Sequence, residues 1–157
     1  MVIARSRLVN AGLLFLLIAV ALGASLLLPK LLHLNDAPVP QQVIGPVACD
    51  IEAGPCISRH GDLAVRFAVN GEVIGSYQPL QFNVEVAGLR PDSVTIDFEG
   101  VDMFMGINRL VLDENTAGDF SGTLGLPGHA HPMLWRARVL LEKGGTLIDA
   151  GFEFELE

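Results

Sequence analysis

The sequence predicts an all-β protein, an immunoglobulin-like antiparallel sandwich preceded by one N-terminal transmembrane helix. Two observations lead to this fold class. A run without charged residues covers positions 8–29, and beyond it apolar residues recur at every second position between clusters of turn residues. The length of 157 residues suits about one domain behind such a segment.

The N-terminal segment, residues 8–30, is predicted to be a membrane anchor. Its apolar run is longer than the core of an ordinary signal peptide, although cleavage within residues 21–24 is the alternative. Arg5 and Arg7 precede it, so the positive-inside rule places residues 1–7 in the cytoplasm. In a bacterium the protein would then be single-pass in the inner membrane, with its C-terminal domain in the periplasm.

A linker, residues 31–46, and a sandwich domain, residues 47–157, are expected after the anchor. Three prolines in the linker favour an extended spacer. After Lys30 the chain carries seven Lys and Arg against 18 Asp and Glu, a net charge of about −11. Nucleic acid is therefore not an expected partner, because phosphate binding needs a basic face.

Six sets of alternating apolar residues indicate strands, and six to eight strands fit the domain. Turn signals separate them at Asn70-Gly71, Arg90-Pro91-Asp92, Gly118 and Gly144-Gly145. Short strands of this number, with no helical period beyond the anchor, favour an immunoglobulin-like sandwich. The sets are Leu63, Val65, Phe67 and Val69; Leu80, Phe82, Val84 and Val86; Val94, Ile96 and Phe98; Phe120, Leu124 and Leu126; Trp135, Ala137, Val139 and Leu141; and Ile148, Ala150, Phe152, Phe154 and Leu156.

Enzymatic signatures do not occur in the sequence. It contains no G-x-S-x-G, no H-E-x-x-H, no P-loop and no dinucleotide-binding glycine pattern. We therefore expect a protein that is not an enzyme.

Met103 and Met105 are the first candidate metal ligands. At positions i and i+2 of an extended strand, two thioethers lie on one side and can converge on one soft ion, of which Cu(I) is the best match. Core packing is the alternative for both, because methionine commonly fills gaps in apolar interiors.

His129, His131 and Met133 are the further candidates. The H-x-H pair lies between Pro127 and Pro132, where a loop can turn imidazoles toward a ligand. Met133 shares the parity of the buried face that begins at Trp135, so a place in the core is its alternative.

Cys49 and Cys56 enclose a Gly-Pro turn that could bring their sulfurs together. Outside the cytoplasm a disulfide is the expected state. The alternative is a reduced dithiol, which could bind metal with His60 or exchange with a disulfide of a partner.

Several short motifs resemble those of the FixH/YtkA-like group and related membrane-tethered periplasmic proteins of cytochrome oxidase assembly and copper handling. They are G-V-D-M-F-M-G at 100–106, G-D-F-S-G at 118–122, Leu126-Pro127, and L-W-R-A-R-V at 134–139. The resemblance implies an immunoglobulin-like sandwich, with Met103 and Met105 as Cu(I) ligands and His129 or His131 completing the site.

The expected function is therefore a membrane-anchored periplasmic copper-binding protein, a metallochaperone for Cu(I). Its partner would be a cytochrome oxidase subunit or another copper carrier. One alternative is a metal-free interaction module with an apolar patch at Met103, Phe104 and Met105. Another is a thiol-disulfide partner that uses Cys49 and Cys56.

Overall fold

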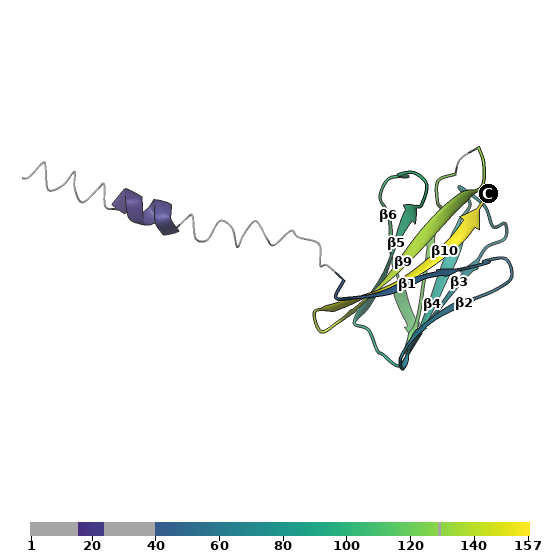
Figure 1. Ribbon diagram of the computed structural model, residues 1–157, viewed down its shortest axis with the longest axis horizontal. Coiled ribbons are helices and arrows are strands. Elements are labelled where there is room, and N and C mark those ends of the chain that lie inside the picture. The colour runs from purple at the N-terminus through teal and green to yellow at the C-terminus, as the bar shows by residue number, and fades with distance from the viewer. Residues whose placement is uncertain (1–15, 24–39, 129) are drawn as a thin grey trace, which may run out of the picture. The chain divides into compact units, whose positions relative to one another are not determined.

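The computed structural model describes residues 16–23, 40–128 and 130–157 (Figure 1). The chain divides into two units, Met1–Pro38 and Val39–Glu157. In the first unit, residues 16–23 form a helix. None of the helical structure in the described residues has both the length and the apolar character needed to cross a bilayer. The anchor predicted at 8–30 falls largely on positions outside the described residues, so it stays a prediction.

The second unit is built from two five-stranded sheets, described in residues 40–128 and 130–157 (Figure 1). All strand pairs are antiparallel except β1 with β10, which is parallel. The first sheet has the order β1 (Gln42–Ala48), β10 (Thr146–Leu156), β9 (Met133–Lys143), β5 (Ser93–Gly100) and β6 (Asn108–Val111). The second has the order β2 (Cys56–His60), β3 (Leu63–Asn70), β4 (Leu80–Ala87), β8 (Asp119–Leu124) and β7 (Asp113–Thr116).

The core lies between the two sheets and consists mainly of the alternating residues that the sequence predicted, together with Cys49, Ile51, Leu112 and Met133. Of the predicted residues, all are buried except Leu63, Leu124 and Ile148, which are partly buried against the others. Phenylalanine rings join the sheets. Phe67 of β3 lies 5.1 Å from Phe152 of β10, measured between ring centroids, and Phe82 of β4 lies 4.6 Å from Phe98 of β5. The prediction of an all-β domain is confirmed.

The folded unit begins earlier than residue 47. β1 starts at Gln42, within the segment expected to be a spacer, and adds to β10 in parallel. Its register shifts between Ile44 and Val47, around Pro46, as is usual for proline in an edge strand. Gly151 faces this bulge, and a Cβ there would lie 3.1 Å from Cα of Pro46. Pairing of this kind depends on a distant strand, which the weak alternation of residues 42–48 does not reveal.

The short strands β2, β6 and β7 were not predicted. β7 carries the sequence D-E-N-T and is exposed at every position, so no burial pattern marks it. β6 and β7 are the outermost strands on the same side of the two sheets, and each is paired on one side.

Cys49 and Cys56 form a disulfide, as the sequence predicted, and the described part of the chain has no free cysteine. The bond closes the turn between β1 of one sheet and β2 of the other. It therefore ties the two sheets covalently at this point. The reduced dithiol, which was the alternative for Cys49 and Cys56, is not the state of the two cysteines in this structure.

Replacing both cysteines with serine should lower the free energy of unfolding by about 2.5 kcal/mol, because the unfolded chain loses the entropy restriction of a short closed loop. Urea denaturation followed by the fluorescence of Trp135 measures this. Reductant should destabilise the wild type by the same amount and leave the double variant unchanged. Equal free energies of unfolding for the wild type and the double variant would contradict the claim that the disulfide stabilises the domain by joining its two sheets.

Candidate functional site

The candidate metal ligands Met103 and Met105 lie in the loop of residues 101–107, which joins β5 to β6. The prediction that they share one side of an extended strand is wrong, because β5 ends at Gly100 and the chain bends at residues 101–103. Gly106 has a φ of +83°, which favours glycine and turns the chain back toward β6. Whether Met103 and Met105 converge on one ion therefore depends on the path of the loop and not on the alternation of a strand.

Two hydrogen bonds hold this loop in place. The backbone N–H of Val101 donates to the carbonyl oxygen of Leu134 at 2.9 Å, which fixes the start of the loop to β9. The side-chain amide of Asn108 donates to the carbonyl oxygen of Met105 at 3.1 Å. The loop thus runs beside the first residues of β9, the strand that begins with Met133.

The three methionines differ in their exposure. Met103 is 45% exposed, Met105 is half-buried against the core, and Met133 is 6% exposed. A Cβ added at Gly100 would lie 3.0 Å from Cγ of Met105 and 3.5 Å from Cε of Met133. The side chains of Met105 and Met133 therefore both lie beside Gly100, with Met103 two residues before Met105 on the same loop.

The histidines are placed only in part. His131 is exposed and lies two residues before Met133, on the segment that enters β9. His129 lies outside the described residues. The structure thus brings together the loop that carries Met103 and Met105 and the segment that carries His131 and Met133. Met133 is also in the core, which was its alternative assignment.

Apolar side chains on this loop are unusually exposed. Phe104 is 85% exposed and Ile107 is 89% exposed. A depression of about 460 Å³ lies beside them, lined by residues from Glu99 to Phe104 and by Gly106. Ile107 was not singled out from the sequence, although its position outside both alternating strand patterns was an available signal.

Ion pairs cover the outer face of the sheet next to the loop. Arg138 donates to Glu99 at 3.0 Å and to Asp149 at 2.8 Å. Burial by itself lowers the pKa of Arg138, but the hydrogen bonds and charges of Glu99 and Asp149 outweigh it, and the pKa is raised. Arg109 similarly pairs with Asp97, which raises the pKa of Arg109. The negative charge of Glu99 is therefore balanced by Arg138. Asp102 is the other carboxylate that lines the depression.

The donor chemistry available here is that of thioethers with imidazole. Among the described residues, no three or more His, Cys, Asp or Glu side chains gather closely enough to hold one ion. A metal at this site would depend on methionine sulfur, which selects soft ions such as Cu(I) and disfavours Mg²⁺ or Ca²⁺. The residues therefore fit a copper ion better than a hard cation.

Comparison of the chain with family models, with curated proteins and with solved structures finds no match.

Replacing Gly100 with alanine should disturb the site, because the added Cβ would collide with the carbonyl oxygen of Met103 and crowd Met105. We expect a loss of about 1–3 kcal/mol in the free energy of unfolding and changed methyl NMR signals of Met105 and Met133. Gly45→Ala is the matched control, since nothing lies within 4 Å of its Cβ position. Equal effects of the two changes would mean that Gly100 is not the contact point.

Proposed function

We propose that this protein binds Cu(I) at the end of its sandwich and delivers it to another protein, without catalysing bond formation. The ligands are Met103, Met105 and Met133 with one of the imidazoles, His129 or His131. The acceptor is a cytochrome oxidase subunit or another copper carrier. The anchor at residues 8–30 holds the domain at the periplasmic face of the inner membrane.

The observation that carries the proposal is that the side chains of Met105 and Met133 both lie beside Gly100. These two residues lie far apart in the sequence and come from different strand connections, yet Cγ of Met105 and Cε of Met133 both lie beside Gly100. His131 and Met103 flank them on the same two segments. Soft donors in such a group are the chemistry that Cu(I) prefers.

The gradient of exposure suits transfer of the ion. Met133 is buried, Met105 is half-buried and Met103 is exposed. An incoming ligand of the acceptor can replace the exposed thioether first, while the inner donors keep hold of the ion. Thioethers also suit an oxidising compartment, because they do not form disulfides there.

We also propose that the sandwich belongs to the immunoglobulin-like class. In that class one sheet contains strands in the order G-F-C and the other in the order A-B-E-D. Lettering the chain from β3 as A gives β10-β9-β5 for G-F-C and β3-β4-β8-β7 for A-B-E-D. Both spatial orders agree with the class, with β1 and β2 as additions before strand A and β6 as an added strand beside strand C.

The copper proposal predicts that Met103→Leu/Met105→Leu weakens Cu(I) binding at least about tenfold. The measurement is a competition titration of the full chain in detergent against a chromophoric Cu(I) chelator. Ile107→Leu is the matched control, because it changes an apolar residue of the same loop without removing sulfur. Equal affinities of the double variant and the control would contradict the proposal.

The same titration has an expected pH dependence. Imidazole must be neutral to bind a metal, whereas thioethers carry no proton. Acidification to about pH 5 should therefore weaken binding only in part, and His129→Ala/His131→Ala should remove the dependence. A complete loss of affinity in acid would point to ligands other than thioethers.

A metal-free interaction module is the second candidate, favoured by the exposure of Phe104 and Ile107. Apolar side chains this exposed on a soluble surface commonly mark a contact with a partner. In this case the methionines would supply adaptable contact area only.

This alternative predicts that Phe104→Ser abolishes association with the assembly partner and that Met103→Leu/Met105→Leu preserves it. Co-purification from membranes of the source cell, compared between these variants, separates the two candidates. The copper proposal predicts the reverse. Met103→Leu/Met105→Leu should impair copper delivery, and Phe104→Ser should keep the Cu(I) affinity of the wild type.

A further inference from the structure

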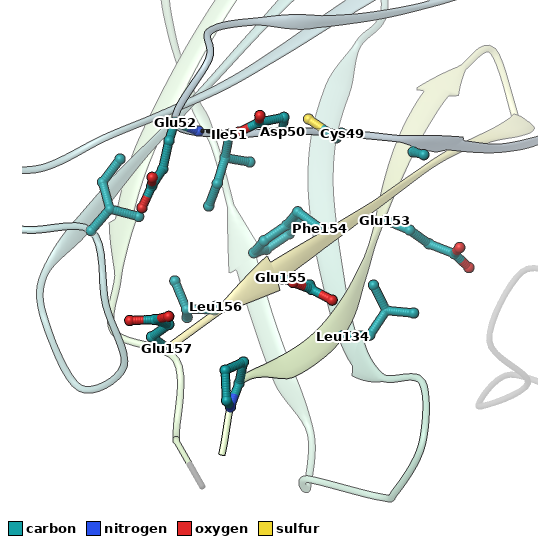
Figure 2. Close-up of a pocket in the computed structure, with 13 residues that line it drawn as sticks. Cys49, Asp50, Ile51, Glu52, Leu134, Glu153, Phe154, Glu155, Leu156 and Glu157 are labelled. Atoms are coloured by element: carbon teal, nitrogen blue, oxygen red, sulfur yellow. Dashed lines mark hydrogen bonds between the residues drawn. The ribbon is translucent and has the colours of Figure 1, made fainter. Parts of the chain in front are cut away.

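A second surface feature lies on the other side of the start of β9, between the end of β10 and the turn that follows β1. It is a groove of about 620 Å³, lined by thirteen residues (Figure 2). Its apolar lining includes Pro132 and Leu134 near the start of β9, and Ile51 and Ile74, and the last residues of β10 also line it. Neither the metal ligands nor the exposed apolar residues of the 101–107 loop line this groove.

The groove exists because β1 leaves β10 before β10 ends. Their pairing stops at Ala48 with Glu153, and the N–H of Cys49 makes the last bond, to the carbonyl oxygen of Glu153 at 2.7 Å. The chain then turns, held by Asp50, whose carboxylate accepts the backbone N–H groups of Glu52 and Ala53. The disulfide that begins at Cys49 secures the same turn.

β10 consequently has a short free edge. It continues to Leu156 and pairs there with β9 alone. On the free side, Glu153 is bonded by Cys49, and the carbonyl oxygen of Glu157 accepts the N–H of Ser76 at 2.6 Å. Along a β-strand, the N–H and C=O of one residue point toward one neighbouring strand, and those of the next residue point toward the other. Glu155 therefore has the same orientation as Glu153 and Glu157. The N–H and C=O of Glu155 therefore face the groove, and in the described residues no bond joins them to β1.

The groove is strongly acidic. Five of its lining residues carry carboxylates: Asp50, Glu52, Glu153, Glu155 and Glu157. Of these, Glu153 is compensated by Arg136, which donates to it at 2.9 Å. None of the thirteen described lining residues is Lys, Arg or His. Figure 2 shows the labelled acidic residues along β10 and on the turn after β1.

The side chains at this edge follow the strand alternation. Glu153 and Glu155 belong to one face of β10, and Phe154 and Leu156 to the buried face. Glu157 follows directly after the strand. A strand added along Glu155 would place every second side chain beside these carboxylates and the others toward the apolar side chains of Ile51 and Ile74. Lysine or arginine suits the positions beside the carboxylates, and an apolar residue suits the positions that face Ile51 and Ile74.

We propose that this groove, the β10 groove, binds a short extended segment of a partner protein that alternates basic and apolar residues. The segment adds to the free edge of β10 through the backbone of Glu155. Its cationic side chains pair with the acidic residues, of which Asp50, Glu52, Glu155 and Glu157 are exposed. This binding site is separate from the metal proposal and does not need a bound ion.

The test uses the full chain in detergent, freed of metal by chelation, at about 0.15 M salt so that long-range attraction is screened. The probe is a capped peptide that alternates lysine and valine, measured by calorimetry. A peptide with glutamate in place of lysine should not bind. Two further versions of the lysine–valine peptide carry N-methyl groups at alternate backbone nitrogens, in the two possible registers. The version that methylates the N–H groups facing β10 should not bind, because it has lost the hydrogen-bond donors for the strand edge.

Glu155→Lys and Glu52→Lys should each weaken binding of the lysine–valine peptide at least about tenfold. Asp113→Lys, at an exposed position on β7, makes the same change in net charge elsewhere and should leave it within about twofold. In the wild type, hydrogen exchange of the Glu155 amide should slow when the peptide binds. These variants keep the metal ligands intact.

Three results would overturn the proposal: equal weakening by Asp113→Lys and Glu155→Lys, binding that survives N-methylation in both registers, or calcium uptake at the carboxylates without peptide binding. Because the protein is metal-free throughout, a failure here leaves the copper proposal standing. A failure to bind Cu(I) likewise leaves this one standing.

Discussion

Packing of phenylalanine rings from opposite sheets, one pair stacked and one tilted, is the interaction on which the rest of the structure depends. Phe67 meets Phe152, and Phe82 meets Phe98, so each sheet is held against the other by rings at fixed strand positions. Such pairs contribute both buried apolar area and a preferred geometry. They join β5 and β10 to the second sheet, and β9 pairs with both of these strands. The ends of the three strands carry both surfaces to which we assign a role.

Both surfaces arise where neighbouring strands stop pairing. β5 ends at Gly100, and the 101–107 loop leaves the sheet beside the start of β9. β1 ends at Ala48, and the turn after it leaves β10 with a free edge. Because β9 pairs with both β5 and β10, its first residues lie between the two features. The proposed metal ligands and the β10 groove are therefore neighbours that use different chemistry, soft sulfur in one case and carboxylates with a backbone edge in the other.

Strand alternation made the core predictable and left the site only partly so. Val94, Ile96 and Phe98 are buried as their spacing indicated, because period two reports burial directly. Met103 and Met105 were assigned to a strand by the same rule, which fails where Gly100 ends the strand and a bond from Val101 to Leu134 sets the chain path. The disulfide was predictable from local spacing. The parallel pairing of β1 and the free edge of β10 were not, since both depend on distant segments.

X-ray absorption at the copper edge of the Cu(I)-loaded full chain identifies the atoms bound to the ion. We expect at least two sulfur neighbours together with imidazole nitrogen. With the cysteines joined in a disulfide, that sulfur has to come from methionine. A spectrum with nitrogen and oxygen neighbours alone, or a protein that retains no copper after desalting, would contradict the copper proposal.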